Sequence, residues 1–84
     1  MPGIVAANPN RPLTFGEDAV GLAFNPSGAA EVYECKRQFA DIIDTLHRLR
    51  ERSSSQDVKR AASVAITEAQ TAQMWAVKAL TMEG

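Results

Sequence analysis

The chain has 84 residues and a mass of 9.1 kDa, and its 9 basic and 10 acidic side chains give a net charge of −1. A domain this small has a limited core and usually needs a disulfide, a metal or self-association for stability. The only cysteine, Cys35, excludes an internal disulfide, and Cys35 with His47 cannot supply four zinc ligands. The near-neutral charge argues against binding to duplex nucleic acid. Self-association is therefore the expected stabiliser.

Residues 1–13 are predicted to form a flexible arm because they contain three prolines, a glycine and two asparagines. This segment lacks the basic start and the apolar run of a signal peptide. The apolar runs of the whole chain are too short to span a bilayer. We therefore expect a cytosolic protein without a membrane partner.

A single helical domain is predicted over residues 14–84. Thr14 and Glu17 match the capping-box pattern, so a short helix should span residues 15–22. The NPSG corner at residues 25–28 suits either a type I turn or the cap of the next helix.

Two long helices should follow, over residues 28–52 and 56–82, with Ser54 and Asp57 as a second capping box. The first has a heptad of bulky residues, and the heptad of the second consists almost entirely of alanine. The bulky heptad comprises Val32, Cys35, Phe39, Ile42, Leu46 and Leu49; the small one comprises Val58, Ala62, Ala65, Ala69, Ala72, Ala76 and Ala79. Small residues allow close approach, so we expect an all-α fold with an antiparallel two-helix hairpin.

The remaining faces of the two long helices differ in character. The first helix presents a charged face that should be solvated, made of Glu31, Glu34, Lys36, Arg37, Asp41, Asp44 and Arg48. The second helix has only one charged residue, Glu68, between Ala61 and Val77. A hairpin leaves this neutral, partly apolar face uncovered, which is typical of an interface. We expect a compact homo-oligomer with an interface formed by Gln70, Gln73, Met74, Trp75 and Val77; the alternative is a monomer whose N-terminal arm covers the face.

The chain offers little for catalysis. His47 has no nucleophile at a neighbouring helical position, Cys35 occupies a core position, and no phosphate-binding loop motif is present. We therefore expect no catalytic residues, no metal and no cofactor. Anion binding is better supported, because Lys59 and Arg60 begin a helix whose N-terminus becomes favourable for cations once a phosphate joins them. The corner formed by Asn25, Ser27 and Gly28 is the second candidate, and a plain helix cap is its structural alternative.

The segments RPLTFGEDAVGLAFNPSG and VAITEAQTAQMWAVKALT, with the heptad helix between them, resemble a known family over residues 11–82. This family comprises small phage anti-defence proteins, the cyclic-nucleotide sponges directed against CBASS immunity and the related sponges directed against Thoeris immunity. The motifs AQMWAVKA and FNPSG are the sharpest parts of the resemblance.

The resemblance implies helical protomers assembled as hexamers in the cytoplasm of the infected bacterial host. Cyclic di- or trinucleotides, or cyclic ADP-ribose isomers in the anti-Thoeris branch, would be held between protomers without being cut. An aromatic residue and a lysine near the start of the first long helix would contact dinucleotides, and Arg60 would contact trinucleotide phosphates. The candidates for the aromatic and the lysine are Phe15, Phe24, Tyr33 and Lys36. Other possible roles are a structural or regulatory assembly protein and an inhibitor that presents Trp75 to a host target.

Overall fold

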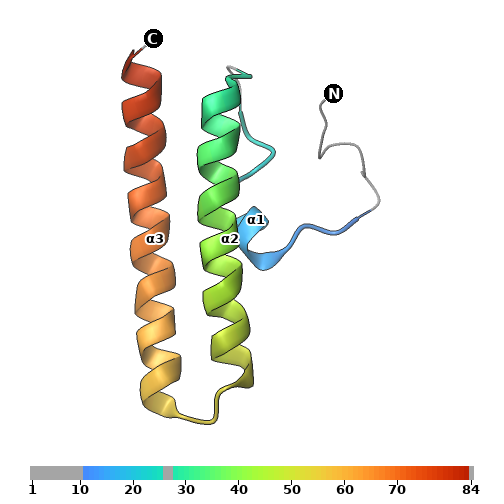
Figure 1. Ribbon diagram of the computed structural model, residues 1–84, viewed down its shortest axis with the longest axis vertical. Coiled ribbons are helices and arrows are strands. Elements are labelled where there is room, and N and C mark those ends of the chain that lie inside the picture. Colours follow the sequence, from blue (N-terminus) through green and yellow to red (C-terminus); the bar gives the residue numbers. More distant parts are fainter. Residues whose placement is uncertain (1–10, 26–27, 84) are drawn as a thin grey trace.

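The computed structural model describes residues 11–25 and 28–83, which form three α-helices and no strand (Figure 1). Helix α1 spans Phe15–Ala19, α2 spans Ala30–Arg52, and α3 spans Gln56–Glu83. Helices α2 and α3 run antiparallel as a long hairpin, and α1 packs against the middle of α2 (Figure 1). The predicted all-α hairpin is therefore confirmed. No helix in this described part is long and apolar enough to cross a membrane.

The first helix is capped as predicted but ends early. The Glu17 backbone N–H donates to Thr14 Oγ1 at 3.1 Å, and the Thr14 N–H donates to the Glu17 carboxylate at 2.9 Å, which completes the capping box. Gly21 then adopts a φ of +60°, and the Leu22 N–H bonds to the Glu17 carbonyl at 3.0 Å. This Schellman arrangement ends α1 at Ala19, three residues before the predicted end.

The corner before α2 closes through its backbone. The Gly28 N–H donates to the Asn25 carbonyl at 3.0 Å, and Gly28 has a φ of +67°. The Asn25 side chain donates to the Ala29 carbonyl at 3.0 Å, so its amide holds the corner together. Helix α2 begins at Ala30, two residues later than predicted, and its N-cap residue Ala29 provides no side-chain cap. Ser27, a predicted ligand residue, lies outside the described residues.

Serine side chains organise the tip of the hairpin. The Ser53 N–H bonds back to the Leu49 carbonyl at 3.1 Å and ends α2. Ser55 Oγ accepts from the Val58 N–H at 3.2 Å, so Ser55 caps α3 in place of the predicted Ser54. The predicted start of α3 at residue 56 agrees with the structure.

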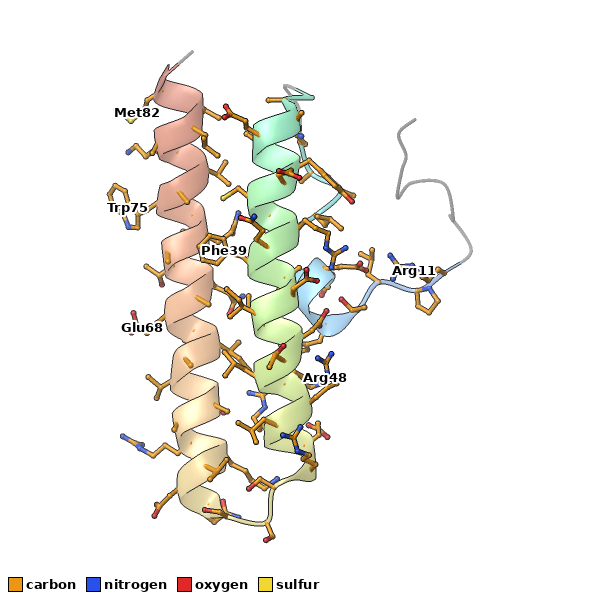
Figure 2. All side chains as sticks on the ribbon, in the orientation of Figure 1. Arg11, Phe39, Arg48, Glu68, Trp75 and Met82 are labelled. Atoms are coloured by element: carbon orange, nitrogen blue, oxygen red, sulfur yellow. The ribbon has the colours of Figure 1, made fainter. Side chains whose placement is uncertain are left out.

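The core lies where the three helices meet. Ala40 and Ile43 of α2 are fully enclosed, and Phe39 points into the space between α2 and α3 (Figure 2). The buried cluster takes residues from the turn that follows α1, from α2 and from α3; its members are Val20, Leu22, Ala40, Ile43 and Ile66. Because the turn that follows α1 supplies two of these side chains, Val20 and Leu22, it completes the core of the hairpin.

The contact face of α3 is rotated relative to the prediction. The heptad series Ala62, Ala69 and Ala76 faces inward, as expected. The second inward series is Ile66, Gln73 and Leu80, whereas the predicted alanines Ala72 and Ala79 are exposed. The large side chain of Ile66 gains more from burial than an alanine does, and this gain sets the register of the helix.

The charged face of α2 is also not fully solvated. Lys36 and Asp44 were expected to be exposed, but they are buried with Ala40 between them, at positions four residues apart. Conversely, Ile42 was placed in the heptad core and is 51% exposed. The reason is that α1 packs against the stripe formed by Lys36, Ala40 and Asp44, which gives α2 two partners instead of one.

Candidate ligand-binding site

A hollow of the described surface lies between the C-terminal end of α1 and the second half of α3. We call it the α1–α3 depression; its volume is about 500 Å³. This volume falls within the range of small-molecule sites. Its lining residues are Asp18, Ala19, Val20, Gly21, Phe24, Lys36, Gln70, Gln73, Met74 and Val77. It brings together a predicted ligand residue, Lys36, and four of the five predicted interface residues.

Lys36 holds the turn after α1 in place. Its ammonium group donates to the Gly21 carbonyl at 3.0 Å and also to the Phe24 carbonyl. The side chain is 5% exposed, and burial lowers the pKa of its ammonium group. Two carbonyls occupy two of the three ammonium donors, so one N–H remains for an acceptor in the depression.

Aromatic and apolar side chains form the outer part of the depression. Phe24 is 72% exposed, and the Lys36 ammonium lies 5.4 Å from the centre of its ring. Such a cation near an aromatic ring strengthens binding of flat, anionic molecules. Met74 of α3 is also exposed and lines the α1–α3 depression together with Phe24. The sequence analysis named Phe24 only as one of several aromatic candidates.

Two glutamines of α3 provide neutral polar groups. Gln70 Nε2 donates to the Ala19 carbonyl over 3.5 Å, a long hydrogen bond that links α3 to α1. Gln73 is only 6% exposed, and its amide has no hydrogen-bond partner in the described part of the chain. Gln73 is buried within the protomer and Gln70 is partly buried. Both residues were predicted to lie on the oligomer interface, and that assignment stays a prediction.

Two of the predicted ligand residues, Lys59 and Arg60, lie away from the depression. Lys59 and Arg60 are at the hairpin tip, at the opposite end of α2 from Asn25 and Gly28 (Figure 1). The Lys59 ammonium donates to the Arg50 carbonyl at 2.8 Å, so it satisfies the C-terminal end of α2. The predicted residues therefore do not form one site within a protomer.

Arg60 differs from its neighbour Lys59. It is exposed on the first turns of α3, and its guanidinium has no hydrogen bond or ion pair with any described residue. Because its five donors are uncommitted, it can bind an anion without breaking a contact in the fold.

Phe15 and Tyr33 have structural contacts. Phe15 stacks on His47 with ring centroids 4.1 Å apart, and the Arg50 guanidinium lies 5.5 Å from the Phe15 ring. Tyr33 is half-buried against the core cluster. The stack of Phe15 on His47 attaches α1 to α2, and the sequence contained no periodic signal for this pair.

Catalytic and metal chemistry find little support in the described residues. In this part of the chain, no group of three or more His, Cys, Asp or Glu side chains could hold a metal ion. His47 Nδ1 lies 3.1 Å from an Arg50 nitrogen; since arginine only donates, Nδ1 accepts and the ring proton is on Nε2. Glu17, the most enclosed acid, is engaged by two arginines.

The face of α3 that points away from α2 is partly apolar. Trp75 and Met82 project outward from this face, with Glu68 the acidic residue among them (Figure 2). Trp75 is 64% exposed, and the Lys78 ammonium lies 5.1 Å from its ring centre. A large exposed tryptophan on a helix with few charges is typical of an interface.

Comparison with protein families gives one match, to the Acb2/Tad1 hairpin domain, over residues 17–81. Comparison with curated proteins finds no match, and neither does comparison with solved structures. The matched segment begins at Glu17 within α1 and contains all of α2 and nearly all of α3, so it covers the depression and the hairpin tip alike. The chain therefore belongs to the Acb2/Tad1 hairpin-domain family, the family of anti-CBASS and anti-Thoeris sponges.

Proposed function

We propose that this protein binds and sequesters cyclic di- or trinucleotide immune signals and does not cut them. It acts in the cytoplasm of a phage-infected bacterium, where it lowers the free signal that activates a host effector. The observation that carries this proposal is the α1–α3 depression, in which Lys36 and Phe24 meet the neutral amides of Gln70 and Gln73.

Each part of the depression suits one part of such a ligand. A cyclic dinucleotide presents phosphates and flat bases. The free donor of the Lys36 ammonium matches a phosphate oxygen, and the exposed Phe24 ring offers a stacking surface for a base. The two glutamines hydrogen-bond without adding negative charge, so they do not repel the phosphates.

Assembly completes the site in this proposal. Met74 and Val77 line the depression and also belong to the predicted interface. A neighbouring protomer at this face covers the depression and contributes its own residues to the ligand. A compact homo-oligomer, with six protomers as the expected number, thus places its ligand sites between chains. Membrane and duplex nucleic acid are not partners.

Arg60 is assigned to a second kind of site. Its free guanidinium at the hairpin tip is suited to a phosphate, and the tip lies away from the α1–α3 depression. We assign the depression to dinucleotides and Arg60 to trinucleotides.

Holding without cleavage is consistent with the side chains present. Phosphodiester hydrolysis needs an activated nucleophile and groups that stabilise developing charge. His47 is stacked on Phe15 and hydrogen-bonded to Arg50, so it is not placed as a free general base.

The experiment that tests the proposal measures the free and the recovered ligand separately. The protein is mixed with less than one equivalent of a cyclic dinucleotide, a cyclic trinucleotide or a cyclic ADP-ribose isomer, and the free ligand is separated by filtration. At least one cyclic oligonucleotide should leave the free pool and return intact after heat destroys the protein. Linear products that increase with time contradict the sponge, and depletion of the ADP-ribose isomer alone supports the anti-Thoeris alternative.

A further inference from the structure

Gln73 is an unusual residue for the inner face of α3. It occupies the series Ile66, Gln73 and Leu80, which faces the interior, and it is 94% buried. An apolar side chain would fill such a position without a desolvation cost. Among the described residues, every fully enclosed side-chain nitrogen or oxygen has a hydrogen-bond partner. The Gln73 amide has no hydrogen-bond partner among these same residues. Its amide must therefore reach open space, and the space that it lines is the α1–α3 depression.

The surroundings of this amide restrict what can meet it. Gln70, the other amide in the depression, already donates to the Ala19 carbonyl. Lys36 provides a cation close to the exposed ring of Phe24. A ligand that reaches Gln73 therefore passes a flat apolar surface and meets one unpaired amide at the inner end. This favours a planar ring with polar atoms on its edge.

The chemistry of an amide defines that edge further. A glutamine presents an N–H donor beside a carbonyl acceptor, so its complement is an acceptor beside a donor. Adenine offers this pair through its exocyclic amine and an adjacent ring nitrogen, and glutamine makes two hydrogen bonds to it. Guanine offers a carbonyl beside a ring N–H, which the same amide matches after a half-turn of its terminal group.

We propose that Gln73 is a specificity-determining residue that makes a two-point hydrogen bond to the edge of one base of the bound nucleotide. It distinguishes a base edge that carries an adjacent donor and acceptor from an edge that lacks either group, and both adenine and guanine carry such a pair. This inference rests on the proposed function, because it names the part of a cyclic nucleotide that the depression recognises.

The test compares two ligands that differ only at the base edge. These are cyclic di-AMP and its analogue with unsubstituted purine in place of both adenines, which lacks the exocyclic amine. By calorimetry, wild-type protein should bind cyclic di-AMP about tenfold more tightly or better. Gln73→Met keeps the side-chain length without a donor or acceptor, and it should bind the two ligands equally. Gln38→Met, at an exposed position of α2 that does not line the depression, is the matched control and should keep the wild-type preference.

The outcomes separate the inference from the proposed function. If wild type binds neither these ligands nor any other cyclic di- or trinucleotide, both fail. If it binds another cyclic oligonucleotide but not cyclic di-AMP, the role of Gln73 fails and the proposed function stands. If it binds the two ligands equally, or if Gln73→Met keeps the preference, only the role of Gln73 fails. A measurement on the wild type keeps the inference testable if the Gln73→Met variant does not fold. The side-chain amide signals of Gln73 in nitrogen-15 spectra should shift when cyclic di-AMP is added, and they should shift less when the analogue is added. Unchanged signals at saturation contradict the inference.

Discussion

At the scale of single residues, Glu17 joins three parts of the chain. Its carboxylate accepts from Arg11 at 2.9 and 3.0 Å, from Arg37 at 2.6 Å and from the Thr14 N–H at 2.9 Å. The hydrogen bonds from Arg11, then those from Arg37 and Thr14, lower the pKa of Glu17 from 4.5 to about 2, although burial opposes the change. The segment before α1, α1 itself and α2 are thus fastened by one carboxylate.

This arrangement predicts a pH-dependent contribution to stability. The unfolded chain takes up a proton on Glu17 near pH 4.5, whereas the folded chain does so only near pH 2. The stabilisation is therefore complete above the higher value and is lost as the pH falls toward the lower one. Glu17→Gln should lower the free energy of unfolding by roughly 2 kcal/mol at neutral pH, after allowance for screening by solvent.

Urea unfolding at several pH values checks this prediction. The difference between wild type and Glu17→Gln should shrink as the pH falls from 4.5 to about 2. Glu34→Gln is the control, because Glu34 is exposed on α2 and should change neither stability nor its pH dependence. A constant difference between wild type and Glu17→Gln over this range would mean that the ion pairs contribute nothing.

Asp44 makes a buried polar link between α1 and α2. Its Oδ1 accepts from the Gly16 N–H at 2.6 Å in a buried position. Any side chain at position 16 would collide with the Ala40 carbonyl oxygen, so the backbone of α1 lies directly against α2. Asp44→Ala leaves this N–H without a partner and should cost about 1–3 kcal/mol.

A matched variant one turn earlier tests whether burial is the cause. Asp41 pairs with Arg37 at 3.0 Å, but its side chain is 69% exposed. Asp41→Ala should therefore cost less than about 0.5 kcal/mol. Thermal unfolding followed by circular dichroism measures both variants. Equal losses for Asp44→Ala and Asp41→Ala would contradict the role given to the buried hydrogen bond.

At the scale of elements, the sequence predicted the positions of the helices better than it predicted which of their faces are buried. The three helices and the start of α3 follow from capping residues and heptads, which are local signals. The burial of Lys36, Asp44 and Gln73 does not follow from them, because it depends on where α1 and its turn pack. That packing is a contact between residues far apart in the sequence. A heptad pattern read with a single packing partner for each helix predicts that such residues are exposed to solvent.

The seam between α2 and α3 can be tested at one position. Ala62 is 2% exposed and belongs to the inward alanine series. Ala62→Leu adds volume where the helices are in close contact and should cost about 1–3 kcal/mol. Ala61 is the neighbouring alanine and is exposed, so Ala61→Leu is the matched control and should be nearly neutral. Urea unfolding distinguishes the two; equal stability of both variants would show that the seam tolerates large side chains.

At the scale of the whole molecule, the two candidate phosphate sites lie apart. Arg60 is at the hairpin tip, whereas Lys36 is beside the α1–α3 depression. A charge-assisted hydrogen bond contributes about 1.5–3 kcal/mol, so Arg60→Glu should weaken binding of a cyclic trinucleotide by more than about tenfold. Binding of a cyclic dinucleotide should be unaffected. Calorimetry with both ligands measures this, with Arg52→Glu as the control at the same tip; equal weakening by both variants would indicate only a general effect of charge.

The last prediction concerns the outer face of α3. This face has few charges in an otherwise well-charged protein; its exposed large residues include Val64, Met74, Trp75 and Met82. Residues 1–10, which precede Arg11 in the N-terminal arm, lie outside the described residues. Arg11 itself pairs with Glu17 beside α1 (Figure 2). A second copy of the chain is therefore the proposed cover for this face. Light scattering should give several times the 9.1-kDa mass of one chain.

Trp75→Lys places a charge in the centre of this face. Because Trp75 is 64% exposed within a protomer, its replacement should leave the helical content unchanged but should shift the scattering mass toward that of one chain. Thr45→Lys adds the same charge to an exposed position of α2 and should leave the assembly intact. A wild-type protein that is monomeric at micromolar concentration would rule out the assembly, and a Trp75→Lys variant with the wild-type mass would place the interface elsewhere. If the assembly alone completes the ligand sites, Trp75→Lys should also lose cyclic-nucleotide binding, even though Trp75 does not line the depression.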